Sequence, residues 1–418
     1  MATLKLLNKI GRRLHSIITW PPRAFVRSYR SILSFICHLL TDTHWLLDYF
    51  PSRKNGIRTI LLVRLDLIGD FIIWLDSAKE LKKIYPDSHL VLYANAIWAD
   101  VARQFLYWDE VVAVNVPKLR IDDAYRIRVF TQIRRRGFQI AIQPTFSREY
   151  IGDLTIRSSA APLRIGHAGD LNNIALAKKL STDTWYSSLV HVSPTAKSEF
   201  QYNEAFIKQL GQSGFIGTLS KIPELCTLPT RLCIPESYIL IMPGASWLPR
   251  AWPSADFIDL IKQLSAIQDY AIILCGGPDE VSLCSQISTL CPNNRVVNLA
   301  GQTTLIELIE IVRGATLLIA NESSAIHIAA ATDTPSVCIT GGGHFGRFMP
   351  YPAYQTSDCR LPWVASHQMS CFGCKWKCQF ELSSDQTVPC VSNIPLTAVL
   401  NAALSALSQP LSSPDQPA

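Results

Sequence analysis

Short apolar runs alternate with stretches of helical periodicity through the first half of this chain. Strand-like runs occupy residues 58–64, 90–94, 111–116 and 139–143. Helical patterns lie between them, for example over residues 71–85 and 121–136. Strands that alternate with helices predict a parallel sheet covered by helices on both faces. We therefore expect a first α/β domain over residues 57–215.

A second alternating series follows a proline-containing stretch. Residues 216–236 hold Pro223, Pro229 and Pro235 and are expected to form a linker. Apolar runs then recur at 238–242, 270–275, 296–299, 316–320 and 336–340. The pattern predicts a second α/β domain over residues 237–408, so that two doubly wound domains face each other across a cleft.

The stretch around residues 316–343 carries the strongest functional signal. A polar break, Asn321 to Ser324, separates a buried strand from a helix rich in small residues. Such a break lies at the carboxyl edge of a parallel sheet, where ligands bind. Ser323 or Ser324 can cap the helix, whose amino-terminal end suits an anion such as phosphate. Glu322 could accept hydrogen bonds from sugar hydroxyls, and His327 could steady the loop or touch phosphate.

Two further loops hold candidate chemistry. Asp70 follows Gly69 in a predicted strand-to-helix loop, where it could take a proton from an attacking hydroxyl. The alternative is an acid that only stabilises the helix terminus. The loop after residue 242 contains Ser246 and Arg250, a hydroxyl and a guanidinium that together resemble a diphosphate clamp.

The glycine run at residues 341–346 (GGGHFG) satisfies the dinucleotide pattern G-x-G-x-x-G. Pro350 and Pro352 forbid the helix that should follow and hold pyrophosphate, so we reject a dinucleotide site. The glycines still allow a ligand to approach the backbone closely.

Charge and cysteine usage narrow the class of protein. The formal net charge is +6. Residues 1–50 contain seven Lys or Arg against two Asp, which leaves +5 there. A nearly neutral remainder argues against nucleic-acid binding. The basic, interrupted leader (residues 1–56) is too broken to span a bilayer and suits amphipathic helices on an anionic membrane surface, or helices packed on the protein itself. Residues 409–418 are expected to be disordered.

The twelve cysteines are mostly scattered through apparent core segments, which predicts a reducing compartment. One set is clustered: Cys371, Cys374, Cys378 and Cys390. Four thiolates could hold zinc, but the spacing is not that of a common paired knuckle. Free thiols or a disulfide are the alternatives, and we expect no metal and no cofactor.

Five motifs occur in the order seen in glycosyltransferase family 9, the heptosyltransferases of lipopolysaccharide core assembly. They are ILLVRLDLIGD (60–70), PGASWLPRAWP (243–253), CGGPDE (275–280), LAGQTT (299–304) and NESSAIH (321–327). The resemblance covers about residues 57–400. It implies a GT-B fold and a metal-independent, inverting transfer of a sugar, typically from ADP-heptose, to a lipid-linked saccharide. The cysteine cluster also resembles that of some members.

Carried over by this resemblance, Asp70 matches the catalytic base, Ser246 and Arg250 match phosphate-contacting positions, and residues 322–324 match the donor-binding loop. The family often has Asp-Ser/Thr-Gly where this chain has Glu322-Ser323-Ser324, and Lys where it has Arg250. These departures change the shape of the sugar pocket.

The sequence thus predicts a glycosyltransferase that lies on the cytoplasmic face of the inner membrane. Its partners would be a nucleotide-diphosphate sugar, a lipid-linked acceptor and, through residues 1–50, the membrane. The alternatives are a GT-B epimerase or phosphorylase, and a catalytically drifted nucleotide-sugar-binding or scaffold protein.

Overall fold

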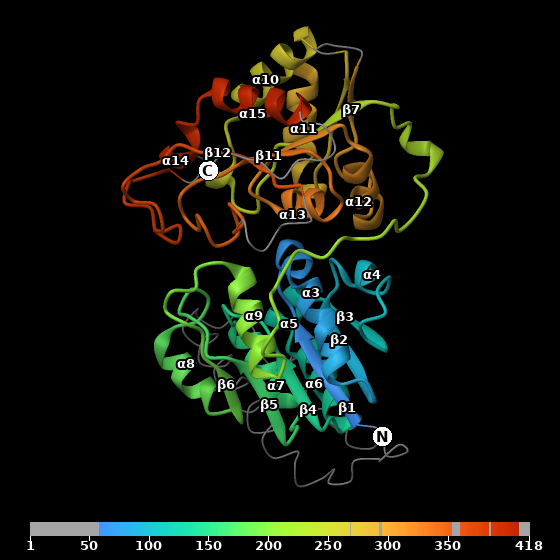
Figure 1. The fold of residues 1–418 in the computed structure, drawn as a ribbon, viewed down its shortest axis with the longest axis vertical. Helices are drawn as coiled ribbons and strands as arrows, with labels where there is room; N and C mark the ends of the chain where they lie inside the picture. Colours follow the sequence, from blue (N-terminus) through green and yellow to red (C-terminus); the bar gives the residue numbers. More distant parts are fainter. Residues whose placement is uncertain (1–57, 268, 292–294, 353–359, 384–385, 409–418) are drawn as a thin grey trace, which may run out of the picture.

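The structure is a computed structural model and describes residues 58–267, 269–291, 295–352, 360–383 and 386–408. The basic leader and the carboxyl-terminal tail predicted from the sequence lie outside these residues. Two α/β units lie one above the other (Figure 1). No helix in the described part of the chain is long and apolar enough to cross a membrane.

The first unit is built on a six-stranded parallel sheet with the order β3-β2-β1-β4-β5-β6. Its central strand is buried, and Leu62 pairs with both Leu92 and Ile142. The strands are β1 (Arg58–Arg64), β2 (Ser88–Asn95), β3 (Glu110–Val114), β4 (Ile140–Gln143), β5 (Leu163–His167) and β6 (Ser188–Val190).

Helices cover both faces of this sheet, as predicted (Figure 1). They are α3 (Ile68–Ile84), α4 (Ala99–Ala102), α5 (Val116–Ile121), α6 (Asp123–Arg136), α7 (Tyr150–Ser158), α8 (Leu176–Asp183) and α9 (Glu199–Gln209). The helix predicted over 121–136 is confirmed as α6, except that it begins at Asp123 and Ile121 belongs to α5. The backbone of Asp122 is extended and its side chain accepts a hydrogen bond from Tyr125 N, so it ends α5 and caps α6.

The second unit repeats the same plan, with the order β12-β11-β10-β7-β8-β9. Its strands are β7 (Tyr238–Met242), β8 (Ala271–Leu274), β9 (Val296–Asn298), β10 (Leu317–Asn321), β11 (Ser336–Ile339) and β12 (Trp363–Ala365). Its helices are α10 (Ser254–Ile267), α11 (Val281–Leu290), α12 (Leu305–Gly314), α13 (Ser324–Ala331), α14 (Pro389–Ser392) and α15 (Leu396–Ser408), with short 3₁₀ turns η2 (Thr230–Leu232), η3 (Leu248–Arg250) and η4 (Pro278–Glu280). The sequence did not predict β12.

The segment predicted as a linker crosses between the two units and bonds to both of them (Figure 1). Thr218 donates to Asp76 of α3 from its backbone N and its hydroxyl, each over 3.0 Å. Ile222 N donates to Ala331 O over 2.9 Å, at the end of α13. The segment therefore fastens α3 and α13 in their relative positions.

In both sheets the strand order reverses between the first and fourth strands of the unit, β1 and β4 or β7 and β10. The connections from these strands leave the sheet in opposite directions, which opens a crevice at their carboxyl ends. Residues that follow β1, β4, β7 and β10 are therefore the ones placed to bind a ligand.

Candidate active site

The predicted site residues follow the strands at these two reversal points. Asp70 comes after β1, Ser246 and Arg250 come after β7, and Glu322 to Ser324 come after β10. The two points face each other, because helix α3 after β1 packs against helix α13 after β10. A Cβ atom added to Gly69 would lie 2.8 Å from His327 Cδ2 and 3.7 Å from Ser324 Cα. The structure thus brings the residue before Asp70 into contact with the 321–327 segment.

Asp70 lies in the first turn of α3 rather than in a loop, because α3 begins at Ile68 and not at Phe71. A carboxylate at that position is normally stabilised by the helix dipole. Here burial, followed by the nearby charges of Asp66 and Glu199, raises the pKa of Asp70 to about 7 despite Arg64 and Arg347. A carboxyl group with a pKa near 7 can accept a proton at neutral pH and is well suited to general base catalysis.

Arg64 organises this end of the first sheet, a role that was not predicted from the sequence. Its side chain is buried, and its Nε lies 2.9 Å from Asp66 Oδ2. Its guanidinium carbon lies 5.1 Å from the centroid of the Trp74 ring. It donates to Pro144 O over 3.2 Å and to Asp70 O over 3.0 Å. Arg64 thereby ties the ends of β1 and β4 to the turn that carries Asp70.

Asp66 is the second acidic group at this reversal point. Burial raises its pKa, while Arg64 opposes that change. Its Oδ2 accepts from Thr145 Oγ1 over 3.2 Å, and its Oδ1 has no hydrogen-bond partner among the described residues. The available sequence signal for this pair was an arginine at the end of an apolar run, Arg64, followed two positions later by Asp66.

Glu322 and Arg250 meet at the reversal point of the second sheet. Arg250 Nη2 donates to Glu322 O over 3.4 Å and lies 3.9 Å from Glu322 Oε2, which accepts from Thr340 Oγ1 over 2.7 Å. Glu322 is 9% exposed, and burial raises its pKa although Arg250 and Thr340 oppose this. Its Oε1 has no hydrogen-bond partner among the described residues. A buried acceptor without a partner costs stability, and a ligand hydroxyl would satisfy it.

The three serines of the predicted site differ in their surroundings. Ser246 is exposed in the loop after β7. Ser323 occupies the position before α13 with an extended backbone, and Ser324 begins the helix. The prediction that a serine hydroxyl caps α13 is wrong, because the side chain of Ser323 makes no capping hydrogen bond. Both serines are half-buried where the positive end of the α13 dipole lies.

Asn321 is the residue that joins the two loops of the second unit. Its Nδ2 donates to Pro243 O over 2.7 Å and to Gly244 O over 3.2 Å. Its Oδ1 accepts from Trp252 N over 2.9 Å. The side chain thus fixes the loop that carries Ser246 and Arg250 beside Glu322. In the sequence, Asn321 looked only like part of a polar break.

His327 is 4% exposed and packs between the two units. Its Nδ1 lies 2.5 Å from Tyr351 Oη. Burial lowers the pKa of His327 to about 4, so the ring is neutral at pH 7. Of its two predicted roles, steadying the loop fits these contacts, whereas a neutral ring offers no positive charge to phosphate.

The three glycines at 341–343 are covered by this chain's own aromatic side chains. A Cβ atom at Gly342 would lie 2.2 Å from Phe372 Cδ1, and one at Gly343 would lie 2.2 Å from Trp376 Cδ2. The expectation that these glycines admit a ligand is therefore wrong, since Phe372 and Trp376 occupy that space. The described residues 341–352 form turns without a helix, in agreement with the rejection of a dinucleotide site.

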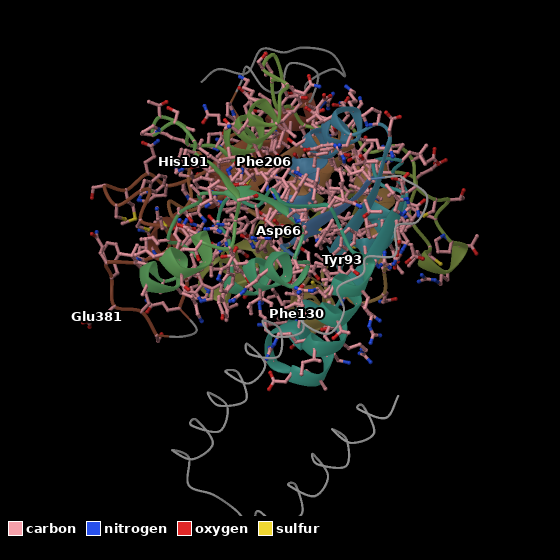
Figure 2. All side chains as sticks on the ribbon, turned by 90° about the horizontal axis from the view of Figure 1, so that it is seen from below. Asp66, Tyr93, Phe130, His191, Phe206 and Glu381 are labelled. Carbon is pink, nitrogen blue, oxygen red and sulfur yellow. The ribbon has the colours of Figure 1, made fainter. Side chains whose placement is uncertain are left out.

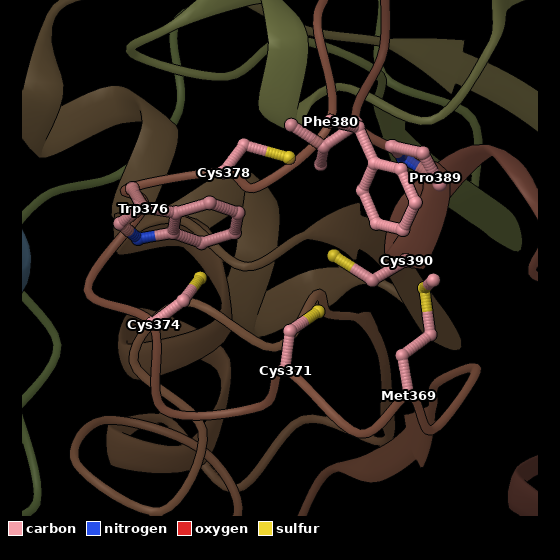
Figure 3. Close-up of a pocket in the computed structure, with 9 residues that line it drawn as sticks. Met369, Cys371, Cys374, Trp376, Cys378, Phe380, Pro389 and Cys390 are labelled. Carbon is pink, nitrogen blue, oxygen red and sulfur yellow. The ribbon is translucent and has the colours of Figure 1, made fainter.

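The clustered cysteines line one pocket and their side chains point toward it (Figure 3). No disulfide joins these four cysteines in the structure. Within the described parts of the chain, no three His, Cys, Asp or Glu side chains are close enough to hold a metal ion. Cys390 Sγ accepts from Gly342 N over 3.4 Å, so the cluster also supports the glycine run.

These observations define a two-domain GT-B type protein, with two Rossmann-like sheets whose reversal points face each other and carry the candidate site. A family model described as glycosyltransferase family 9 (heptosyltransferase) matches residues 191–372. Over these residues the chain is similar to glycosyltransferase family 9.

Individual relatives show the same similarity. The chain is 34% identical over 108 residues, 25% of its length, to lipopolysaccharide heptosyltransferase 3 of Escherichia coli, of which 32% is covered. It is 26% identical over 193 residues, 44% of its length, to the protein of that name from E. coli K12, of which 55% is covered. The chain therefore spans about a third to a half of these relatives.

Among solved structures, E. coli ADP-heptose lps heptosyltransferase II superimposes with a TM-score of 0.59 and 17% identity. The superposition covers 84% of this chain and 98% of that structure. At this identity the likeness shows the shared fold.

Proposed function

We propose that this protein is an inverting, metal-independent glycosyltransferase. It would move heptose or a related sugar from a nucleotide-diphosphate donor to a lipid-linked saccharide such as lipopolysaccharide core. The observation that carries the proposal is that Asp70, with a pKa of about 7, directly follows Gly69, which packs against His327 and Ser324. The similarity to the family and the names of the E. coli heptosyltransferase relatives support the type of transfer.

In the proposed reaction Asp70 removes the proton from the acceptor hydroxyl. The resulting oxygen attacks the anomeric carbon of the donor sugar and forms the new glycosidic bond. The bond from that carbon to the diphosphate oxygen breaks, and the nucleoside diphosphate leaves with the electron pair. Attack from the face opposite the leaving group inverts the anomeric centre. Arg64 and Asp66 fix the position and the pKa of the base.

The second unit would stabilise the leaving diphosphate. Arg250 supplies a fixed positive charge, Ser246 a hydroxyl, and the start of α13 at Ser323 and Ser324 the positive end of a helix dipole. Glu322 Oε1, a buried acceptor that lacks a partner among the described residues, would accept from a sugar hydroxyl. His327 would hold the loop rather than contact phosphate directly.

The acceptor would be reached at the membrane surface through the basic residues of the amino-terminal leader. A lipid-linked saccharide lies at a membrane, and the basic residues 1–50 would bring the enzyme to the anionic cytoplasmic face. Deletion of residues 1–50 should release the protein from anionic vesicles. Unchanged vesicle binding after the deletion would contradict the membrane role and leave the proposed catalysis untouched.

A thermal-shift and calorimetric panel of ADP-, GDP-, UDP- and dTDP-sugars tests the donor site. We expect one donor to stabilise the wild-type chain and Glu322→Ala to weaken that response. No response to any donor would contradict the proposal. Product analysis with the selected donor and a lipid-linked acceptor then separates the alternatives. An epimerised or phosphorolysed donor without a new glycosidic bond would indicate the epimerase or phosphorylase, and tight binding without any turnover would indicate the drifted protein.

A further inference from the structure

An aromatic ring lies directly against the guanidinium group of Arg250. The guanidinium carbon is 4.5 Å from the centroid of the Trp376 ring. Arg250 has only distant polar contacts with Glu322, at 3.4 Å to the backbone oxygen and 3.9 Å to Oε2. The arginine head group therefore lies between the indole face and Glu322.

Backbone hydrogen bonds to the glycine run (residues 341–343) hold the loop that carries Trp376. Gly373 N donates to Gly342 O over 2.7 Å, and Lys375 N donates to Gly343 O over 2.8 Å. Lys375 and Trp376 both have left-handed backbone conformations, with φ of 55° and 62°. Residues other than glycine rarely adopt this conformation, so the backbone of the loop is strained at Trp376.

The ring also makes edge contacts with Trp247 and His344, at centroid distances of 6.2 and 6.3 Å. Its Nε1 is buried and has no hydrogen-bond partner among the described residues. A buried indole N–H without an acceptor is unfavourable, and tryptophan is normally placed where that group is satisfied. The ring lies in the loop between Cys374 and Cys378, at the side of the thiol-lined pocket (Figure 3).

We infer that Trp376 is a positioning residue that keeps the guanidinium of Arg250 stacked on its indole face, directed at the donor diphosphate and held back from the Glu322 carboxylate. This inference rests on the proposed function, because it assigns a support to the proposed phosphate contact. Arginine is a long side chain that would otherwise close onto the buried carboxylate. The stack leaves both the positive charge of Arg250 and the free Oε1 of Glu322 available to a ligand.

The first test measures the Kd of ADP, GDP, UDP and dTDP by calorimetry, with no sugar and no acceptor present. For the nucleoside diphosphate that the wild-type chain binds, Trp376→Leu should raise the Kd roughly 3- to 30-fold, the range expected for loss of a cation–π contact. Trp376→Phe keeps an aromatic face and should recover most of the affinity. In turnover assays the loss should fall mainly on the KM of the donor rather than on kcat.

A double-mutant cycle distinguishes positioning from general loss of structure. If Trp376 acts through Arg250, Trp376→Leu should have almost no further effect on Kd in an Arg250→Ala background. The matched control is Trp185→Leu in the first unit, because the guanidinium carbon of Arg157 lies 4.4 Å from the centroid of the Trp185 ring. This pair is distant in sequence from the proposed donor-binding residues. This control should leave the Kd unchanged.

Each result has a separate meaning. A wild-type chain that binds no nucleoside diphosphate overturns both the proposed function and this inference. A wild-type chain that binds one, together with a Trp376→Leu variant of equal affinity and equal thermal stability, overturns this inference alone. Additive losses in the cycle also overturn it, because they show that Trp376 acts independently of Arg250. If Trp376→Leu fails to fold, Trp376→Met, which also lacks an aromatic face, takes its place in the cycle.

Discussion

Arg347 and Glu199 join the two halves of the molecule through a paired contact. Arg347 donates to Glu199 Oε2 from Nε over 3.0 Å and from Nη2 over 2.9 Å. The backbone is paired as well, since Glu199 N donates to Arg347 O over 3.0 Å. Arg347 lies in the loop after β11, and Glu199 begins α9 in the first unit. Both charges also act on Asp70: Glu199 raises its pKa and Arg347 lowers it.

Glu199→Gln should therefore change stability and pH dependence together. Glu199 is 2% exposed, so removal of its charge leaves the mostly buried Arg347 poorly compensated and should cost about 3 kcal/mol of unfolding free energy. Because Glu199 raises the pKa of Asp70, the acidic limb of kcat/KM should move to lower pH. Urea unfolding and a pH–rate profile measure the two effects.

An exposed acidic residue provides the control for this variant. Asp259 pairs with Lys262 over 3.2 Å, with both side chains 57% exposed. Asp259→Asn should change the unfolding free energy by less than about 0.5 kcal/mol and leave the pH profile in place. A Glu199→Gln variant as stable as Asp259→Asn would contradict the assigned role of the cross-domain contact.

Asp70→Asn should stabilise the protein in a pH-dependent manner. The native pKa of about 7 lies above the ordinary value of 3.8, so the folded state holds the proton more tightly than the unfolded state. Between these values, wild-type stability falls as pH rises, and the loss is complete above about pH 7. Asparagine cannot ionise. The melting temperature of Asp70→Asn relative to wild type should therefore increase from pH 4 to pH 8, and a constant difference would contradict the raised pKa.

Gly69→Ala tests the packing between α3 and α13. The added Cβ would lie 2.8 Å from Cδ2 of His327, which is buried and bonded to Tyr351. The two helices must separate, and we expect kcat/KM to fall about 10- to 100-fold, although alanine favours helix formation. Gly214→Ala is the control, because an added Cβ there meets nothing within 4 Å. Equal activities for the two variants would show that this close approach is unimportant.

Glu322→Gln separates recognition of the sugar from recognition of the nucleotide. An amide can still accept from Thr340 but no longer offers a charged oxygen to a sugar hydroxyl, and it leaves Arg250 without its acidic neighbour. We expect the Kd of the full donor to rise about 10-fold, while that of the nucleoside diphosphate alone stays equal or falls. Equal weakening of both ligands would place Glu322 at the nucleotide instead. Calorimetry with the two ligands in parallel provides the comparison.

The alternation of apolar runs and helical patterns was sufficient to predict two parallel sheets, because most of their strands are short apolar runs bounded by polar residues. The strands β5, β6 and β12 were not predicted. Boundaries were less accurate. We predicted that this helix begins at Phe71, because Asp66, Gly69 and Asp70 are typical of a loop. In the structure α3 begins at Ile68. This shift moves Asp70 from a loop into a helical turn without changing its proposed role.

Side chains that act through tertiary contacts were beyond reach of the sequence pattern. Arg64 looked like the end of a strand, yet it is buried and bonds to two separate segments. Asn321 looked like part of a turn, but it fastens the loop after β7. Trp376 gave no signal, because its partner Arg250 is distant in sequence. Residue type alone does not give the position of a side chain in the fold. In Figure 2 Asp66 lies near the centre of the view and Glu381 at its edge, although both are acidic.

Transfer of labelled heptose from ADP-heptose to a lipid-linked core acceptor tests the central claim most directly. The wild-type chain should form a glycosidic product with inverted configuration in the presence of EDTA. Asp70→Asn should reduce turnover about 10²- to 10⁴-fold while it binds the donor with nearly unchanged affinity. Near-normal transfer by Asp70→Asn would contradict the assignment of Asp70 as the base, and no glycosidic product from the wild-type chain with a donor that it binds would contradict the proposed glycosyl transfer.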